Sequence, residues 1–347
     1  MDDDEVMRRA MELAADVRGT TAPNPWVGCV IESPSGVRYE GATAPPSGPH
    51  AEAAALAAAG ADATGGTAWV TLEPCAHHGR TPPCADALIA AGIRRVVVAL
   101  EDPDPRVAGR GIAALREAGV EVEVGVEADA VRRQLAPYLK QRATGRPYVV
   151  LKLAATLDGR IAAPDGSSQW ITGGAARADS HQLRAESDAI VVGAGTVRAD
   201  DPSLTVRDAP GRDPLRVVLG TVAPEARVHP ALEFSGPIPD LLDDLGRRGV
   251  LQVMVEGGAT VAAAFHQAGL VDRYVVYLAP ALFGGDDAVP MFAGTGAPTM
   301  ADVWRGRLVE VAQLGDDVRI DVEPAAPTLH TGQVPVVAVE AETQGAR

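Results

Sequence analysis

Short runs of β-branched residues alternate with alanine-rich helical patterns along this 347-residue chain, and that order restricts the folds it can adopt. A helix between two strands buries its apolar side only by packing across a sheet, so the alternation predicts a layered α/β architecture. The first series has strand patterns at 26–32, 36–42, 66–72, 94–100 and 120–126. The second has them at 148–155, 189–194, 215–220, 251–257 and 273–280.

A polar stretch separates the two series. "YLKQRATGRP" is basic and ends near Gly and Pro, which is typical of a connector. A chain of this length is long for one domain and comfortable for two. We therefore expect one domain at 1–145 and a second at 146–322. The remainder, 323–347, is rich in Pro, Ala and small polar residues, which predicts a disordered tail.

Composition and charge exclude several classes of function. The net charge of −15 disfavours a nucleic-acid partner, which requires a basic surface. No apolar run approaches the roughly 20 residues that span a bilayer, and the acidic start "MDDDEVMRRA" is unlike a signal peptide. We expect a cytoplasmic protein that acts on small molecules, with no membrane partner. Exposed strand edges in the second domain favour a homo-oligomer, a dimer or a tetramer.

Two of the three cysteines lie close together in the loop sequence "EPCAHHGRTPPC". They are Cys75 and Cys84, and His50 opens a predicted helix upstream. One histidine and two cysteines make a zinc ligand set that leaves the fourth tetrahedral position to water. Cys84 lies just inside the next predicted helix, whose N-terminal partial positive charge favours the thiolate that zinc binds.

Glu52 lies two positions after His50 on the same helical turn, where its carboxylate could reach a zinc-bound water without ligating the metal. It could take a proton from that water and pass it to a leaving ammonia. A zinc-binding histidine, a non-ligand glutamate and a cysteine pair are the signature of zinc nucleobase deaminases. The alternative is a structural zinc completed by His77 or His78, which would leave Glu52 without a role. Cys29, inside an apolar strand, is predicted to be a core residue.

Four motifs of the first domain closely resemble one family. They are "TAPNPWVGCVI", "PHAEAAAL", "TLEPCAHHGRTPPCADALI" and "DPDPRVAGRGI", and they resemble the deaminase half of the bifunctional riboflavin-biosynthesis deaminase/reductase family. Eight residues separate the two cysteines, where the generic deaminase signature has two. The resemblance implies a cytidine-deaminase-like, three-layer α/β/α domain. It also implies hydrolytic removal of the 2-amino group from 2,5-diamino-6-(5-phosphoribosylamino)pyrimidin-4(3H)-one.

The same resemblance assigns roles within the first domain. It implies that the three ligands named above hold one Zn²⁺ per chain and that Glu52 shuttles protons. Asn24, in a "PNP" turn, offers a donor and an acceptor to a pyrimidine edge, or is simply a turn residue. Arg80 pairs with the ribose phosphate, or is a solvated arginine.

The second domain resembles the reductase half of that family. The matching segments are "LKLAATLDGRIAAPDGSSQWIT", "HQLRAESDAIVVGAGTVRADDPSLTVR" and "VMVEGGATVAAAFHQAGLVDRYVVYLAPALFGG". The resemblance implies a dihydrofolate-reductase-like α/β fold. It implies NADPH-dependent reduction of the ribosyl chain of 5-amino-6-(5-phosphoribosylamino)uracil to a ribityl chain.

Residue chemistry supports a site in this second domain. In "EGGAT", between a strand and a helix, Gly257 and Gly258 permit close approach of a phosphate, and the helix N-terminus attracts the anion. The alternative is a plain tight turn. Lys152 is one of only two lysines and lies mid-strand among apolar residues, where a cation is costly unless it is used. The resemblance places it in the active site, facing the sugar.

The resemblance further implies two sets of contacts. Residues along the nicotinamide cofactor are Ala154, Trp170, Thr196 and Asp200. Residues at the phosphoribosyl substrate are Ser168, Arg184, Leu204, Arg207 and Glu256. The chain departs from the family at Gly220 and Thr221, where "DS" is typical, and its 220–250 segment is short. This region should border the adenosine end, so the departure bears on NADPH affinity and on the choice between NADPH and NADH.

Three competing hypotheses remain from the sequence. The first keeps deamination only, with the shortened second domain serving oligomerisation. The second is a tRNA adenosine deaminase, which requires a basic face and the shorter cysteine spacing, and this chain has neither. The third is a non-enzymatic scaffold stapled by zinc.

Overall fold

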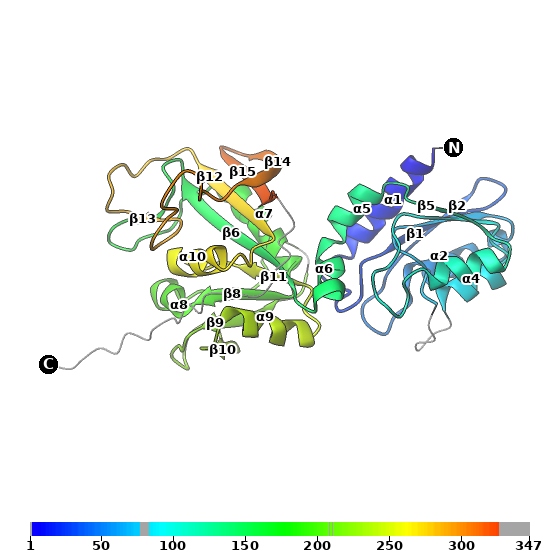
Figure 1. The fold of residues 1–347 in the computed structure, drawn as a ribbon, viewed down its shortest axis with the longest axis horizontal. Helices are drawn as coiled ribbons and strands as arrows, with labels where there is room; N and C mark the ends of the chain where they lie inside the picture. Colours follow the sequence, from blue (N-terminus) through cyan, green and yellow to red (C-terminus); the bar gives the residue numbers. More distant parts are fainter. Residues whose placement is uncertain (1, 77–82, 208, 210, 326–347) are drawn as a thin grey trace. The chain divides into compact units, whose positions relative to one another are not determined.

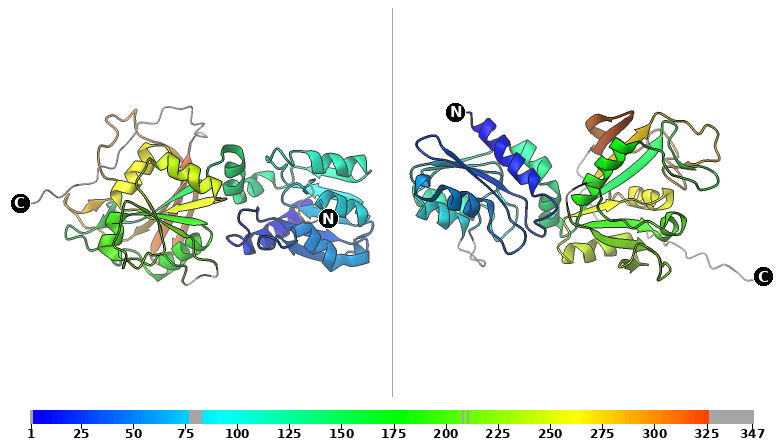
Figure 2. Two further views of the ribbon diagram at one scale, coloured as in Figure 1. Left: turned by 90° about the horizontal axis from the view of Figure 1, so that it is seen from below. Right: turned by 180° about the vertical axis from the view of Figure 1, so that it is seen from behind.

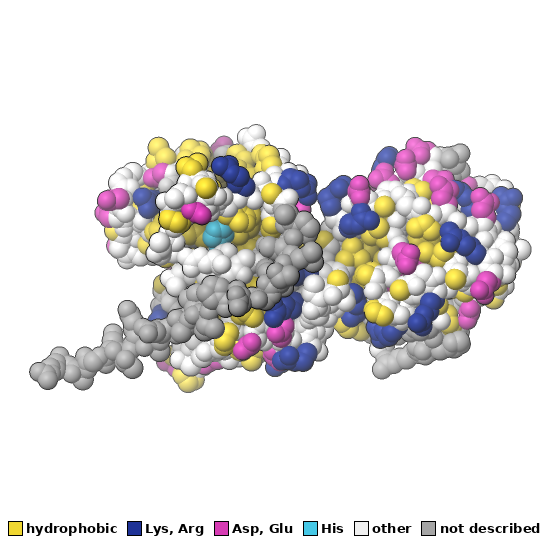
Figure 3. Space-filling view, in the orientation of Figure 1, with side chains coloured by type: hydrophobic (Ala, Val, Ile, Leu, Met, Phe, Trp, Pro, Cys, Tyr) yellow, Lys and Arg dark blue, Asp and Glu magenta, His cyan; other side chains and the backbone are white. Residues whose placement is uncertain are grey.

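The structure is a computed structural model that describes residues 2–76, 83–207, 209 and 211–325. It divides into two compact units, Met1–Arg146 and Pro147–Arg347, shown in Figure 1. Within the described ranges, no helix is both long enough and apolar enough to cross a membrane. On the face shown in Figure 3, acidic and basic side chains are interspersed rather than gathered into one broad basic surface.

The first unit contains a five-stranded mixed sheet between two layers of helices. Its strands are β1 (Gly28–Glu32), β2 (Arg38–Ala42), β3 (Thr67–Val70), β4 (Arg95–Val98) and β5 (Glu121–Val124). Its helices are α1 (Asp3–Asp16), α2 (Ala51–Ala59), α3 (Cys84–Ala90), α4 (Arg110–Glu117), α5 (Ala128–Gln134) and α6 (Ala136–Thr144), with a 3-10 turn at Gly60–Ala63. The strand order is β2-β1-β3-β4-β5, with β1 antiparallel to both neighbours and β3, β4 and β5 parallel.

Two glycines show how closely helices approach both faces of this sheet. A Cβ on Gly28 would collide with the α1 backbone at Ala10, and one on Gly41 would collide with the α2 backbone at Ala51. Gly41 pairs with Cys29, the residue after Gly28, so the two glycines face opposite sides of the sheet. Helices α1 and α5 lie on one face and α2 and α4 on the other, as Figures 1 and 2 show. This confirms the predicted three-layer α/β/α fold.

The second unit is built on an eight-stranded sheet. Its strands are β6 (Tyr148–Thr156), β8 (Ala189–Gly193), β9 (Leu215–Leu219), β10 (Leu232–Phe234), β11 (Gln252–Val255), β12 (Arg273–Ala279), β14 (Gly306–Leu314) and β15 (Asp317–Pro324), and β7 (Arg160–Ala162) and β13 (Val289–Pro290) form a separate pair. Its helices are α7 (Gly174–Ala185), α8 (Ala194–Asp200), α9 (Ile238–Arg247) and α10 (Ala259–Gln267). The order is β10-β9-β8-β11-β6-β12-β15-β14, parallel from β10 to β12 and antiparallel at β15 and β14.

Apolar cores cover both faces of this larger sheet. On β6, Val149 packs with Phe265 of α10 in one cluster, whereas Val150 packs with Leu183 of α7 in another. Lys152 shares the parity of Val150, so it projects to the α7 face. The predicted α/β architecture of the second half is therefore confirmed, and its central lysine lies beside α7.

Three segments differ from the sequence predictions. The stretch predicted to be a connector is mostly helix α6, which buries Tyr138 and Gln141. Strand β15 runs to Pro324, so Glu323 and Pro324 are strand residues rather than tail, and 326–347 lies outside the described residues. Strands β14 and β15 were not predicted, because charged residues interrupt their apolar pattern. One of these, Asp321, is nevertheless fully buried with Arg319 as its partner.

Candidate active sites

The three predicted zinc ligands converge at the starts of two helices in the first unit. His50 is the N-cap residue of α2, Cys84 is the first residue of α3, and Cys75 lies in the loop before α3. His50 Nδ1 lies 3.6 Å from Cys75 Sγ and 3.4 Å from Cys84 Sγ. Three potential ligand atoms, one from each residue, lie within 4.8 Å of one another.

This donor set fits zinc. Nitrogen and sulfur ligands bound tetrahedrally at about 2.05 and 2.3 Å from zinc stand about 3.6 Å apart, close to the two observed separations. A hydrogen bond with the Cys84 side chain lowers the pKa of Cys75, although burial opposes the shift, and the Cys84 backbone N–H also donates to Cys75 Sγ at 3.4 Å. The same pairing raises the pKa of Cys84. His77 and His78, the alternative fourth ligands, lie outside the described residues.

Glu52 lies beside the ligand set without belonging to it. The residue is only 3% exposed, and this burial raises the pKa of its carboxyl to about 7. The charge of Cys75 raises this pKa further, whereas the charge of His50 and a hydrogen bond with Cys84 lower it. Glu52 therefore lies beside the three potential metal ligands, and its raised pKa would suit a group that exchanges protons near neutral pH.

A cavity of about 130 Å³ opens at these residues. His50, Glu52, Cys75 and Asn24 all line it, so the structure brings the predicted pyrimidine-edge asparagine to the metal ligands. The turn that carries Asn24 is closed by its backbone N–H donating to the Thr21 carbonyl at 2.9 Å. Arg80, the predicted phosphate partner, lies outside the described residues.

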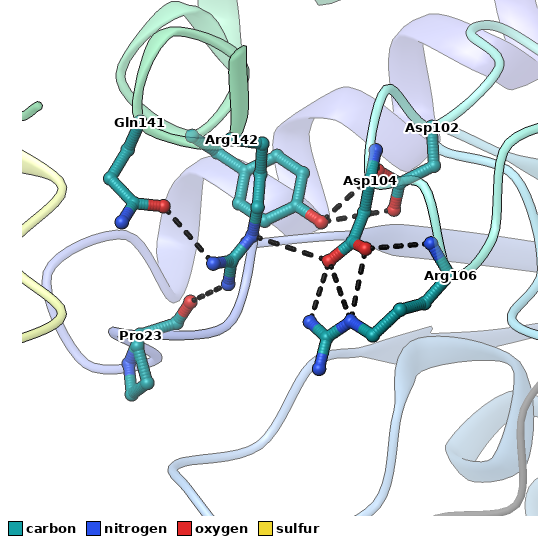
Figure 4. A network of polar contacts seen from close by, with 7 residues as sticks. Pro23, Asp102, Asp104, Arg106, Gln141 and Arg142 are labelled. Atoms are coloured by element: carbon teal, nitrogen blue, oxygen red, sulfur yellow. Dashed lines mark hydrogen bonds and ion pairs between the residues drawn. The ribbon is translucent and has the colours of Figure 1, made fainter. Parts of the chain in front are cut away.

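Several lining residues were missed by sequence reasoning. They come from the loop after β4 and from α6, and they are Asp102, Asp104, Arg106, Val107, Tyr138 and Arg142. Figure 4 shows polar contacts of Asp102, Asp104, Arg106 and Arg142. The Tyr138 hydroxyl donates to Asp102 Oδ2 at 3.0 Å. The motif "DPDPR" was visible in the sequence, but nothing in the connector-like stretch indicated that α6 would reach this cavity.

Glu73 was also missed, and it fixes the loop that carries Cys75. Its buried carboxylate accepts four backbone hydrogen bonds, from the N–H groups of Asp102, Gly109, Gly111 and Ile112, at 2.9–3.2 Å. The cysteine loop is thereby tied to the start of α4 and to the loop before it. The sequence did contain a signal for this role, because Glu73 is an acidic residue directly after the apolar run "AWVTL".

Glu73→Gln is expected to destabilise the first domain by about 2–4 kcal/mol, because an amide nitrogen would face backbone N–H donors that need an acceptor. Equilibrium denaturation of the zinc-loaded protein measures the change. Glu12→Gln is the control, since Glu12 pairs with Arg9 at the surface. A Glu73→Gln protein that unfolds within about 0.5 kcal/mol of the wild type, the ordinary range for a surface change, would contradict this role.

In the second unit, three predicted residues form one largely buried charge cluster. Lys152 Nζ on β6 lies 3.9 Å from Glu256 Oε1, and Arg184 of α7 donates to Glu256 Oε2 at 2.8 Å. Ser180 Oγ donates to the same carboxylate at 3.3 Å. Burial opposes ionisation of Glu256, but Arg184 and Lys152 lower its pKa below the usual range. Two cations share one carboxylate here, which leaves a positive charge beside β6.

The predicted phosphate turn lies at the carboxyl edge of the parallel strands, where α/β sheets bind ligands. Gly258 is the N-cap of α10, and no side chain caps that helix start. A Cβ on Gly257 would overlap the side chain of Val261. Thr196 Oγ1 of α8 lies 3.6 Å from where a Cβ on Gly258 would stand.

The remaining predicted residues make other contacts. Ser168 Oγ donates to Asp200 Oδ1 at 3.4 Å, at the end of α8. Trp170 is 68% exposed and stacks against the Arg177 guanidinium, 4.7 Å from the ring centroid. Three more residues are placed as follows: Ala154 lies on β6 opposite Tyr277, Leu204 is buried with a positive φ of 51°, and Arg207 donates its backbone N–H to His181.

Comparisons with known proteins find matches for both domains of the chain. The family model for the RibD C-terminal domain matches residues 147–320, and that for the cytidine and deoxycytidylate deaminase zinc-binding region matches residues 1–100. The riboflavin biosynthesis protein RibD of Escherichia coli K12 is 41% identical over 361 residues, covering 92% of this chain and 98% of that protein. The chain belongs to the RibD family.

Solved RibD structures match the whole architecture. Acinetobacter baumannii RibD has a TM-score of 0.87 at 41% identity, covering 93% of this chain and 99% of that one. The Thermotoga maritima diaminohydroxyphosphoribosylaminopyrimidine deaminase/5-amino-6-(5-phosphoribosylamino)uracil reductase has a TM-score of 0.84 at 33% identity, covering 93% and 98%. The chain is thus a bifunctional RibD enzyme of riboflavin biosynthesis, with a zinc-binding deaminase domain and a reductase domain. This confirms the two-activity hypothesis over the deaminase-only alternative.

Proposed function

We propose that residues 1–145 deaminate 2,5-diamino-6-(5-phosphoribosylamino)pyrimidin-4(3H)-one. We further propose that residues 146–322 reduce the ribosyl chain of 5-amino-6-(5-phosphoribosylamino)uracil to ribityl with NADPH. The convergence of His50, Cys75 and Cys84, next to a cavity that His50, Cys75 and Glu52 line, carries the proposal. The name of the T. maritima relative describes a deaminase of a diaminohydroxyphosphoribosylaminopyrimidine and a reductase of 5-amino-6-(5-phosphoribosylamino)uracil.

In the deaminase, the three ligands would hold one zinc ion, which supplies an activated water at neutral pH when bound. Glu52 would accept a proton from that water and deliver it to the departing ammonia. Asn24 would hold the pyrimidine edge through its amide, at the same cavity wall. Arg80 would be a candidate partner for the ribose phosphate.

In the reductase, NADPH would supply the hydride. The start of α10 at Gly258, which no side chain caps, fits a phosphate of the cofactor, and Gly257 lets the turn pack against Val261. Lys152 would contact the sugar to be reduced. The proposed cofactor contacts are Ala154, Trp170, Thr196 and Asp200. The proposed substrate contacts are Ser168, Arg184, Leu204, Arg207 and Glu256.

Product analysis by mass spectrometry tests both reactions together. With the diaminopyrimidine alone, the zinc-loaded protein should release ammonia and accumulate the aminouracil. With NADPH added, the ribityl product should replace it. Ammonia release without any NADPH oxidation would overturn the reductase proposal, and a substrate left intact would overturn the deaminase proposal.

Purified protein is expected to contain about one zinc per chain, because the cluster offers one complete three-ligand set. The double variant Cys75→Ser with Cys84→Ser should lose that zinc, since hydroxyl groups replace two thiolate ligands. Elemental analysis measures the content. Cys29→Ser is the matched control, because Cys29 lies in strand β1 outside the cluster. Zinc that survives in the double variant would refute the ligand assignment.

A further inference from the structure

We propose that Arg106 and Arg142 form the phosphate-binding end of the deaminase cavity. This inference rests on the proposed deaminase substrate, whose ribosyl group carries a phosphate. The pyrimidine must reach the zinc ligands, so the phosphate lies elsewhere along the cavity wall. The two arginines are the residues of that wall that best meet its charge.

The two guanidinium groups come from separate elements and meet at one carboxylate. Arg106 follows β4 in the chain, and Arg142 lies on α6; both line the cavity. Arg106 donates to Asp104 Oδ2 at 2.6 Å, and Arg142 Nε lies 3.7 Å from the same oxygen (Figure 4). Asp104 therefore holds both cations at one part of the wall.

The charges of the cavity leave few places for a phosphate. Four carboxyl groups line it, those of Glu52, Glu73, Asp102 and Asp104. A dianion would be repelled from most of this wall. Among the lining residues that the structure describes, the guanidinium groups of Arg106 and Arg142 are the permanent cations. A phosphate bound in this cavity would therefore be drawn to them.

The arginine pair retains a net positive charge. Hydrogen bonds from Arg106 lower the pKa of Asp104 to about 2, so this carboxylate is ionised at neutral pH and balances one of the two cations. Neighbouring Asp102 is occupied by the Tyr138 hydroxyl and by the Asp104 backbone N–H at 2.8 Å. Counted over Asp104 and the two arginines alone, one positive charge remains for an incoming anion.

Donors for such an anion are available on both arginines. A guanidinium has five N–H donors. Arg142 donates two of its N–H groups to the Gln141 side chain and to the Pro23 carbonyl, both at 3.0 Å. Arg106 points Nε and one terminal nitrogen at Asp104, and its side chain is 67% exposed. Pro23 directly precedes Asn24, the proposed contact of the pyrimidine. The hydrogen bond from Arg142 to Pro23 therefore holds the proposed phosphate site at a set distance from the pyrimidine site.

The test compares the proposed substrate with the same pyrimidine riboside lacking its phosphate. For each protein, the ratio of kcat/KM on the phosphorylated compound to that on the dephosphorylated one is measured with zinc bound. Arg142→Met and Arg106→Met should each lower this ratio about tenfold to hundredfold, the usual effect of losing a hydrogen bond to a charged group. The loss should lie mainly in KM.

Two features keep the test decisive. Arg132→Met is the matched control, because Arg132 pairs with Asp129 on α5 outside the cavity. Its ratio should equal that of the wild type. Arg106 is largely exposed, so Arg106→Met should fold even if Arg142→Met does not. Zinc content and thermal unfolding verify the fold of each variant.

Two outcomes would overturn the inference. If both arginine variants lose activity equally on the two compounds, the arginines only support the fold. If Arg80→Met lowers the ratio and neither Arg106→Met nor Arg142→Met does, the phosphate binds elsewhere. A wild-type protein that deaminates neither compound would instead refute the proposed substrate, and that failure is seen before any variant is made.

Discussion

Glu52→Gln is expected to lower the deaminase rate by about 10²–10⁴-fold, the usual contribution of a positioned proton-transfer group. The amide matches the carboxylate in size but cannot accept the proton of the attacking water. Because Glu52 lies beside the ligand set and is not part of it, the variant should keep its zinc. Ammonia release and elemental analysis measure the two quantities on the same preparation.

The control is Glu40→Gln, which removes a carboxylate of the same unit that pairs with Arg9. It should leave the deaminase near the wild-type rate, and both variants should retain NADPH oxidation with the aminouracil. Deaminase activity within a few-fold of the wild type in Glu52→Gln would mean that another group moves the proton. Loss of zinc together with activity would assign Glu52 to the metal site instead.

Lys152→Ala should lower the reductase rate by about 10²–10³-fold, as expected when a positioned charge at a reacting group is removed. Its ammonium lies near the Tyr277 ring and 3.9 Å from Glu256, which also binds Arg184, and we expect it to face the sugar there. Glu256 would keep Arg184 as its partner, so the fold should survive. The aminouracil should accumulate while ammonia release and zinc content stay near normal, and mass spectrometry with excess NADPH detects it.

Lys140→Ala is the matched control, since Lys140 is the other lysine of the chain and lies on α6 in the deaminase domain. It should not change reduction. Lys152→Arg should rescue poorly, because the planar guanidinium is larger and directs its donors differently from an ammonium. A fall of both activities in Lys152→Ala would make the lysine structural, and a fall of neither would remove it from the active site.

The sequence determined much of the deaminase site because its chemistry is local. His50 and Glu52 lie within one helical turn, and the cysteines lie in one loop and at the next helix start. Residues so close in the chain keep their spacing in the fold, and few residue types bind zinc. The main strands were predictable for a similar reason, since each buried strand is a short apolar run.

The connector prediction failed because local polarity misrepresents a helix that is buried on one side. Tyr138 and Gln141 lie three residues apart, on the same side of α6, and both are buried. Asp321 misled in the same way, because its charge hid a strand, β15, that buries it next to Arg319. Burial is set by what packs against an element, which the pattern of a single segment does not contain.

Only the tertiary structure decided which distant residues share a site. Arg142 donates to Pro23 across 119 positions of sequence, and Arg184 reaches Glu256 across 72. These meetings depend on strand order, because the sheet determines which strand ends and which helices become neighbours. The sequence alone determined which groups could perform the chemistry. Folding decided which of them lie at one cavity wall or around one carboxylate, because long-range contacts follow from the packing of whole elements.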